Sequence, residues 1–529
     1  MAGEMIVSRR GALAFGASGV AVAAIPGWAQ AGGEPAVDAI VNRFMSSFQM
    51  PGIGVAIVRP NRADFTRGYG VRTLGRPDRV DEDTLFAIAS NSKAFVAAGL
   101  ALLVEEKKIG WDEPVIKHLP DFAMSNPVAT QMMTVRDLLV HRSGLALGAG
   151  DLMQFPLSDH TRADIYRGLR YLPLARGFRS GYAYDNILYV VAGVLIERVS
   201  GMGFEDYVTA RLLRPLGMRT AIPVRDRLPM GANVVGRHAR LGPPVRGMGE
   251  LVVVEADESP AGSPAGGIHA SVSEITNWLA VQLGKGQMRS GKRLWSEAQS
   301  KEMWTPQVIT ASTTGPTADN PAQSVLSGYA LGWFIGDYRG NRLVHHSGGL
   351  SGQITQTALL PERGIGLCVF TNTEDRHAVV GLRNALLDYL LGQTSFDWVA
   401  YTRKRMAADE AEAVKLQGGG DFKVPPGGPS LPLSAYAGRY RDAWYGDVVV
   451  SERAGRLHID FTRTPVFKSA LETFGPDSFR TRFAKGAGED AVVTFVVANG
   501  AVTGIRMKAL SPLADFSYDF HDLNLKRVN

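Results

Sequence analysis

The chain has 529 residues, of which 45% are hydrophobic and 20% charged, and its formal net charge is +6. This composition is that of an ordinary globular protein, and the length allows two or three domains. The basic residues are scattered and form no stripe, so nucleic acid is not an expected partner. The single cysteine, Cys368, excludes an intrachain disulfide, and its apolar surroundings predict a packed thiol on a buried strand.

The N-terminal 31 residues have the pattern of an export signal. Ser8-Arg9-Arg10 precedes a weakly apolar run over residues 11–25, and Ala29-Gln30-Ala31 offers a cleavage site between small residues. The paired arginines indicate the twin-arginine route. An uncleaved anchor is the alternative, but the run is shorter than the roughly 20 apolar residues that a spanning helix needs. We therefore expect cleavage after Ala31, no stable membrane span afterwards, and a periplasmic or secreted protein.

The first 260 residues alternate between apolar runs and helical patterns. Apolar residues at helical spacing predict a helix over 37–48, and two short apolar runs, 52–58 and 65–71, predict a β-hairpin. A helix-rich region punctuated by prolines follows. Within it, residues 134–145 have the pattern of a capped helix that stops at a glycine, with His141 as a structural histidine near its end.

From residue 329 the pattern changes to short strands separated by turn residues. Strands are predicted over 329–335, 342–345, 353–360 and 364–370, with a covering helix over 379–391. A polar helix over 401–415 and a Gly/Pro-rich linker then lead to a separate domain. There, strand-like runs at 438–440, 447–450, 457–461, 478–483, 491–497 and 516–520 predict a small antiparallel sheet or barrel. This last domain shows no catalytic constellation.

The segment from Thr84 to Phe95 holds the only Ser-x-x-Lys pair of the chain, Ser90 and Lys93. If a helix begins near Ser90, the two side chains lie about one turn apart on the same face. The helix N-terminus adds free backbone N–H groups and a partial positive charge. A nucleophile, a proton acceptor and an oxyanion site then come from one turn, although a chance pair of two common residues is the plainer interpretation.

Two later segments carry further polar groups. Tyr184-x-Asn186 interrupts two helical stretches and can aim a phenol and an amide into a cleft; the alternative is a packed Tyr and a turn-forming Asn. His345-His346-Ser347-Gly348-Gly349 lies between two predicted strands, and its glycines indicate a close approach of the backbone to a ligand. The paired histidines have no third ligand at metal-site spacing, so we expect neither a metal nor another cofactor.

Taken in order, Ser90-x-x-Lys93, Tyr184-x-Asn186 and His346-Ser347-Gly348 resemble the motifs of the serine β-lactamase and penicillin-binding protein superfamily. The third takes the place of the Lys-Thr-Gly motif. The likeness covers about residues 35–395 and is nearest to the class C β-lactamase-like branch, which includes esterases, D-aminopeptidases and related peptidases. The C-terminal part resembles the lipocalin-like domain that is appended to many such hydrolases.

The resemblance implies an α/β (α+β) fold, with a central antiparallel sheet flanked by helices, an α-helical region, and a small antiparallel β-barrel after it. The chain would then divide into a signal peptide (1–31), a catalytic domain (32–400), a helix and linker (401–432) and the barrel (433–529). It further implies that Ser90 forms an acyl-enzyme, with Lys93 or Tyr184 as its base. Asn186, His346 and Gly348 would contact the substrate, and the backbone N–H groups of Ser90 and Gly349 would form the oxyanion hole.

His346 stands where β-lactamases and carboxypeptidases of the superfamily have a lysine that binds a substrate carboxylate. A mostly neutral histidine is a weaker anion site, which favours a peptidase or amidase of the D-aminopeptidase type. The expected substrates are small peptides. These include peptides with a D-residue, such as linearised microcystin. A carboxylesterase or β-lactamase with the same machinery is the alternative. A non-catalytic peptidoglycan- or ligand-binding protein would have no need of Ser90, Lys93 and Tyr184 together. The sequence predicts no oligomeric state.

Overall fold

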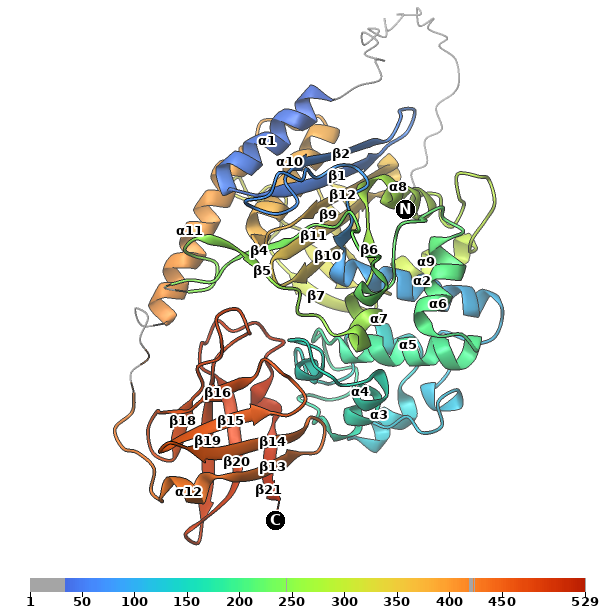
Figure 1. The fold of residues 1–529 in the computed structure, drawn as a ribbon. Helices are drawn as coiled ribbons and strands as arrows, with labels where there is room; N and C mark the ends of the chain where they lie inside the picture. The colour runs from blue at the N-terminus through green and yellow to red at the C-terminus, as the bar shows by residue number, and fades with distance from the viewer. Residues whose placement is uncertain (1–33, 244, 418–421, 423, 529) are drawn as a thin grey trace, which may run out of the picture.

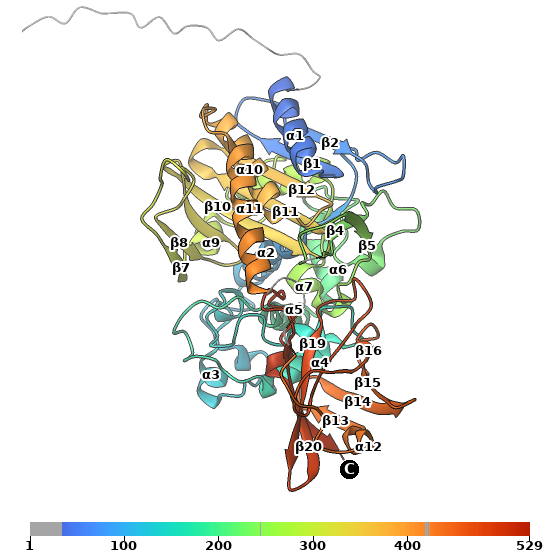
Figure 2. The ribbon, with the colours of Figure 1, turned by 90° about the vertical axis from the view of Figure 1, so that its left-hand side faces the viewer.

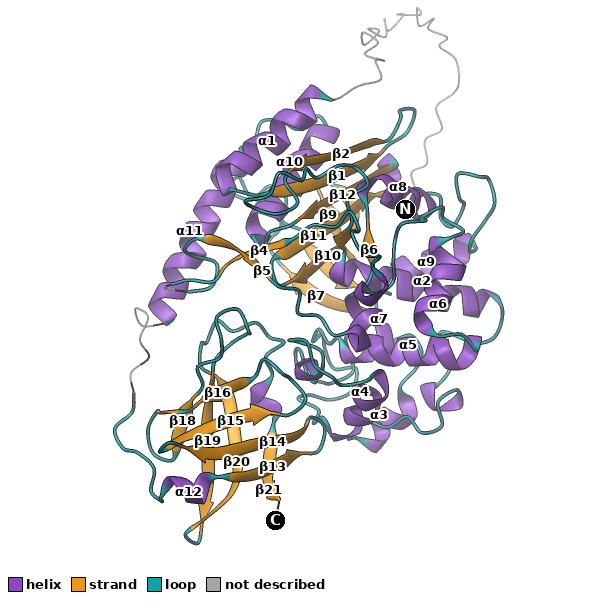
Figure 3. Ribbon diagram, in the orientation of Figure 1, coloured by secondary structure: helices purple, strands orange, loops and turns teal. Residues whose placement is uncertain are grey.

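The computed structural model of this protein describes residues 34–243, 245–417, 422 and 424–528. The predicted export signal and its cleavage site lie outside these residues. Figure 1 shows a larger domain, in which helices flank a sheet, and a smaller domain of strands at the C-terminal end. In Figure 3 the strands of both domains are orange and the helices are purple, so that the sheet, the helical region and the C-terminal strands can be told apart.

An eight-stranded antiparallel sheet forms the centre of the larger domain. Its order is β2-β1-β12-β11-β10-β9-β8-β7, so the first strand of the domain pairs with the last, with Ile53 opposite Thr371. Every residue of β1, β11 and β12 is buried, because layers cover both faces of the sheet. This explains the largely apolar sequences of β1 and β12, whereas β11 also buries two glutamines and two threonines. The strands are β1 (Gly52–Val58), β2 (Phe65–Gly70), β7 (Val308–Ser312), β8 (Leu326–Tyr329), β9 (Phe334–Tyr338), β10 (Asn341–Leu350), β11 (Gln353–Leu360) and β12 (Ile365–Thr371).

Three helices, α1 (Pro35–Phe48), α10 (Arg376–Leu390) and α11 (Trp398–Leu416), pack together on one face of the sheet, and Figure 2 looks towards them. The other face contacts α8 (Val272–Leu283). Beyond it lies the helical region, whose main helices are α2 (Ser92–Glu105), α3 (Pro127–Met132), α4 (Arg162–Gly168), α5 (Ile187–Ser200), α6 (Phe204–Val208), α7 (Ser263–Gly266) and α9 (Glu297–Trp304). The predicted mixed fold with a central antiparallel sheet is confirmed.

The helix predicted over 134–145 was wrong. The structure has only a 3₁₀ turn there, η3 (Asp137–Leu139). The Asp137 carboxylate accepts hydrogen bonds from the Thr134 backbone and hydroxyl and from Arg142, which closes the turn on itself. His141 then adopts a φ of 55°, in the left-handed region that ends a helix.

The C-terminal domain is a nearly closed antiparallel barrel with strand order β16-β15-β14-β13-β21-β20-β19-β18-β17. The predicted strand over 516–520 was wrong, since this segment is a loop that runs into the 3₁₀ turn η10 (Phe520–Asp522). The strands follow a short helix, α12 (Leu433–Tyr436), and are β13 (Gly438–Asp442), β14 (Gly446–Arg453), β15 (Arg456–Phe461), β16 (Lys468–Ala470), β17 (Glu472–Thr473), β18 (Ser478–Arg480), β19 (Ala491–Ala498), β20 (Ala501–Ala509) and β21 (Asn524–Val528).

The barrel packs directly on the helical region. His160 contacts the backbone carbonyl of Tyr445 through Nε2 at 2.8 Å, and the Asp159 backbone N–H donates to the Arg463 carbonyl at 2.9 Å. One hydrophobic cluster continues from the helical region into the barrel. Among the described residues, no single helix has the length and apolar composition to cross a membrane, although α5 and the segment Phe204–Leu213, bent by 77°, pass that test as a pair.

Candidate active site

Ser90 lies where a strand turns into a buried helix. The short strand β3 (Phe86–Ala87) leads into a 3₁₀ turn, η1 (Ala89–Asn91), which continues as α2. Ala89 has a φ of 48°, a left-handed conformation that costs a non-glycine residue about 1 kcal/mol or more. This sharp turn leaves Ser90 partly exposed between two buried neighbours, at the N-terminal end of the helix.

Lys93 is fully buried one turn after Ser90. Its Nζ lies 3.2 Å from Ser90 Oγ, and 2.8 Å from both Asn186 Oδ1 and the Ala265 carbonyl oxygen of α7. Burial lowers the pKa of Lys93 to about 7, against the opposing effect of the Asp151 and Asp185 carboxylates. A neutral amine keeps two N–H donors for Asn186 and Ala265, and its lone pair can then accept the proton of the Ser90 hydroxyl.

Tyr184 lies beside these two groups. The centre of its ring is 4.9 Å from Lys93 Nζ. Burial raises the pKa of Tyr184 well above 10, and a hydrogen bond with the Ser90 side chain opposes the shift only in part. The phenol is therefore protonated at neutral pH, so the geometry and charge of the site favour Lys93 as the base and leave Tyr184 as a proton donor.

Asn186 connects Lys93 to a carboxylate that the sequence analysis missed. Its Nδ2 donates to Asp151 Oδ2 at 2.8 Å. Burial raises the pKa of Asp151 to about 7, and the hydrogen bonds from Asn186 and Ser517 oppose that shift. Asp185 is a second buried carboxylate near Lys93, and it accepts from the Ser143 hydroxyl at 3.2 Å. No motif in the sequence singles out Asp151, and Asp185 is the variable middle position of the Tyr184-x-Asn186 motif.

His346 lies near the site, but its geometry argues against the predicted contact with substrate. The side chain is only 1% exposed. Nδ1 lies 2.6 Å from the Ser347 carbonyl oxygen and so donates to it, which leaves Nε2 to accept from the Tyr329 hydroxyl at 2.9 Å. Burial, with the nearby Lys93, lowers the pKa of His346 to about 3. Both nitrogens of this neutral ring are thus engaged within the protein.

His141 supports the ring of Tyr184 from within the core. The two ring centres are 4.1 Å apart, and His141 Nδ1 accepts from the Asp185 backbone N–H at 3.1 Å. Burial lowers the pKa of His141 well below 6.5. The neutral imidazole therefore packs as part of the core. This agrees with the prediction that His141 is a structural histidine.

Gly348 brings strand β10 against the turn that carries Ser90. A Cβ atom at Gly348 would lie 2.2 Å from the Ile88 carbonyl oxygen and 2.4 Å from Thr355 Oγ1. Thr355 Oγ1 donates to that carbonyl at 2.9 Å and accepts from Asn91 Nδ2 at 2.9 Å. Gly348 thus contributes close backbone packing, while the neighbouring Gly349 is exposed.

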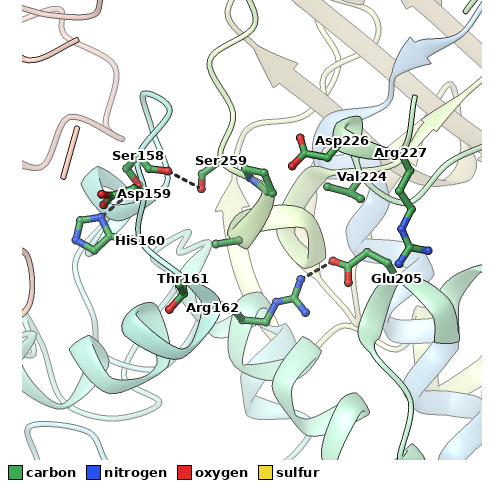
Figure 4. Close-up of a pocket in the computed structure, with 12 residues that line it drawn as sticks. Ser158, Asp159, His160, Thr161, Arg162, Glu205, Val224, Asp226, Arg227 and Ser259 are labelled. Atoms are coloured by element: carbon green, nitrogen blue, oxygen red, sulfur yellow. Dashed lines mark hydrogen bonds and ion pairs between the residues drawn. The ribbon is translucent and has the colours of Figure 1, made fainter. Parts of the chain in front are cut away.

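The described residues do not meet the requirements of a metal site, and one pocket lies outside the Ser90 site. Within the described ranges, no group of three His, Cys, Asp or Glu side chains has the arrangement to hold a metal ion. A pocket of about 520 Å³ lies next to the segment that leads into α7, but it contains neither Ser90 nor Lys93 (Figure 4). Among its polar groups, Arg162 contacts Glu205, and the Ser259 hydroxyl donates to the Ser158 carbonyl at 3.4 Å.

Two family models match successive parts of the chain. The β-lactamase family model matches residues 37–390, and a domain of unknown function (DUF3471) matches residues 423–527. The unguisins hydrolase ungD of Aspergillus violaceofuscus (strain CBS 115571) is 29% identical over 462 residues, which are 82% of this chain and 80% of that protein. Protein flp of Staphylococcus aureus (strain MW2) is 24% identical over 64% of this chain and 63% of its own length.

Two solved structures share the fold. The D-amino acid amidase of Ochrobactrum anthropi SV3, in complex with L-phenylalanine, is 23% identical with a TM-score of 0.55, and the match covers 68% of this chain and 99% of that one. An octameric penicillin-binding protein homologue from Pyrococcus abyssi is 20% identical with a TM-score of 0.54, over 93% and 99% of the two chains. The family model, which spans most of the chain, decides the assignment: the protein belongs to the β-lactamase family of serine hydrolases.

Proposed function

We propose that this protein is a peptidase or amidase that cleaves small peptides through an acyl-enzyme on Ser90. The observation that carries the proposal is the position of Lys93, whose buried Nζ lies 3.2 Å from Ser90 Oγ with a pKa of about 7. A substantial fraction of this lysine is neutral at physiological pH and can act as a base, which an ordinary lysine cannot do.

In the proposed first step, Ser90 Oγ attacks the carbonyl carbon of the substrate while its proton moves to Lys93. The N-terminal end of the helix supplies a partial positive charge for the developing oxyanion, and the backbone N–H groups of Ser90 and Gly349 are its proposed donors. The C–N bond then breaks, and the leaving amine takes a proton from Tyr184, which Lys93 replenishes. In the second step, a water molecule loses a proton to Lys93 and attacks the ester carbonyl, which releases the acid and restores the Ser90 hydroxyl.

The chemistry around His346 supports a peptidase or amidase rather than a β-lactamase or carboxypeptidase. No positive charge stands at the position of the carboxylate-binding lysine, because His346 is neutral and turned into the core. The similarity to an unguisins hydrolase and the shared fold with a D-amino acid amidase support small peptides or amino acid amides as substrates. We propose D-residues at the acyl side of the scissile bond, with linearised microcystin as one substrate to test.

The proposed location of this activity is the periplasm or the exterior of the cell. Its support is the sequence pattern alone: the paired arginines, the short apolar run and the small residues that end at Ala31. N-terminal sequencing of the secreted or periplasmic protein is the test. A chain that starts at residue 32 is expected, and a purely cytoplasmic chain that starts at Met1 would contradict export.

A peptide library read by mass spectrometry tests the substrate class. The library should pair each D-residue at the acyl position with its L-enantiomer, and linearised microcystin and a matched set of p-nitrophenyl esters should be assayed beside it. Ser90→Ala serves as the control for contaminating activity. Cleavage of peptides with a preference for the D-enantiomer is expected. Turnover of the esters with no cleavage of any peptide would instead establish an esterase.

A further inference from the structure

The loop over residues 515–519 of the barrel reaches the carboxylate that holds Asn186. The Ser517 hydroxyl donates to Asp151 Oδ2 at 2.9 Å, on the same oxygen that accepts from Asn186 Nδ2. We propose that Ser517 is a positioning residue of the hydrolase, which acts through Asp151 on the amide of Asn186 and so on the side-chain nitrogen of Lys93. The inference deepens the proposed function and rests on it.

The direction of each hydrogen bond makes this chain of contacts specific. An ionised carboxylate only accepts hydrogen bonds, so the charged form of Asp151 requires the NH₂ side of the Asn186 amide to face it. The amide oxygen is thereby turned towards Lys93, where it accepts from Nζ at 2.8 Å. A flipped amide would present two donors to the lysine and would lose both contacts. Asp151 therefore orients the Asn186 amide so that its oxygen, and not its NH₂ group, contacts Lys93.

The barrel holds Asp151 by its backbone as well as by its side chain. The buried carboxylate of Asp519 accepts from the N–H groups on either side of Asp151, those of Gly150 at 2.7 Å and Leu152 at 3.0 Å. At Gly148, a Cβ atom would lie 2.4 Å from the Phe516 carbonyl oxygen, so the two loops meet closely there as well. The helical region thus relies on the barrel to fix this turn.

The same loop contributes to the surroundings of Tyr184. The ring of Phe516 lies edge-on to that of Tyr184, with 6.1 Å between the ring centres. Contacts from the barrel therefore reach both Tyr184 and the chain that ends at Lys93. If the loop served only to pack the two domains together, it would not need a hydroxyl group that donates to the carboxylate orienting Asn186.

Loss of the Ser517 hydroxyl should lower the pKa of Lys93. Two hydrogen bonds stabilise the Asp151 carboxylate against burial, and its negative charge raises the pKa of Lys93. Removing one of them favours the protonated acid, which weakens that attraction. The acid limb of the activity profile, where Lys93 must lose its proton, is then expected to move to lower pH by about half a unit to one unit. The plateau rate should fall roughly fivefold or more because Asn186 is less well fixed.

The test compares Ser517→Ala with Ser511→Ala, a matched change in the same region of the barrel whose hydroxyl accepts from the Leu513 backbone N–H. The readout is the rate of covalent labelling by a fluorophosphonate probe between pH 5 and pH 9, which does not depend on the natural substrate. Circular dichroism and melting temperature check the fold. Ser517→Thr, which keeps a hydroxyl, should retain the acid limb of the wild type.

A double-mutant cycle with Asp151→Asn shows whether Ser517 acts through Asp151. Ser517→Ala should then have little further effect, because its partner is already changed. Unchanged labelling by Ser517→Ala, an identical change in Ser511→Ala, or additive effects in the cycle would each overturn the inference while the proposed function stands. A wild type that does not label contradicts the proposed serine hydrolase itself, and with it the basis of the inference.

Discussion

The side-chain nitrogen of Lys93 lies 3.2 Å from the hydroxyl oxygen of Ser90, with no exposed surface of its own. Two residues separated by a single helical turn thus place a nucleophile beside a buried amine. Burial makes this amine a base, because it disfavours the charged ammonium form.

The first prediction concerns the pH dependence of kcat/KM. A protonated Lys93 cannot accept the proton of Ser90, so activity should rise with pH and be half-maximal near pH 7, following the pKa of about 7. Lys93→Arg keeps a positive charge at all accessible pH values and should lower kcat/KM by about 100-fold or more. A wild-type profile that is flat from pH 5 to pH 9, or an active Arg variant, would contradict Lys93 as the base.

The second prediction concerns Tyr184 as the donor to the leaving group. Tyr184→Phe should lower kcat/KM for peptides by about 10²–10⁴-fold, since an amine must be protonated as it leaves. The loss should be much smaller for p-nitrophenyl esters, whose leaving group departs as an anion. Measuring both substrates on the same preparation is the check, and equal losses would mean that Tyr184 has another role.

The third prediction concerns His346. Replacing it with Lys should destabilise the protein rather than create a carboxylate-binding site, because the new ammonium would be buried near Lys93 and would leave the Tyr329 hydroxyl without its acceptor. The unsatisfied contact alone costs about 1–3 kcal/mol of the free energy of unfolding. His346→Gln, which keeps an acceptor and a donor, is the milder control in a denaturant titration. A stable Lys variant with a new preference for free C-terminal carboxylates would restore the role that the sequence predicted.

The fourth prediction compares two adjacent glycines. Gly348→Ala would place a methyl group 2.2 Å from the Ile88 carbonyl oxygen, so the turn that carries Ser90 must move. A displacement of this kind can cost 100-fold in rate. Gly349→Ala meets only the ends of two side chains, Ile354 at 3.3 Å and Arg376 at 3.7 Å, and keeps its backbone N–H, so a small loss is expected. Similar kcat/KM values for the two variants would contradict this packing.

The sequence predicted those parts of the site that lie within short segments. Ser90 and Lys93 share one helical turn, and Tyr184 and Asn186 share one loop, so their spacing carried the information. The contact of Ser517 with Asp151 joins residues that are 366 positions apart, and nothing local marks either of them. The segment around Ser517 was even predicted as a strand, because its hydrogen bonds to the other domain could not be foreseen.

The same distinction holds for the fold. The hairpin of β1 and β2 and the strands β11 and β12 follow from short strand-like runs with turn residues between them, and the structure has them within a residue or two of the predicted bounds. The segment 134–145 has a helical pattern but forms no such helix, because the side chain of Asp137 bonds to Thr134 and Arg142 and closes a tight turn instead. The orientation of His346 depended on a distant tyrosine, Tyr329, which the local sequence does not indicate.

The measurement that tests the central claim most directly is the site of covalent modification. The wild-type protein and Ser90→Ala should be treated with a fluorophosphonate probe, digested with trypsin and analysed by mass spectrometry, with circular dichroism as a check that both are folded. The account predicts one adduct, on Ser90, in the peptide that ends at Lys93, and no adduct in the variant. An adduct on another residue, or peptide cleavage by Ser90→Ala at the wild-type rate, would contradict it.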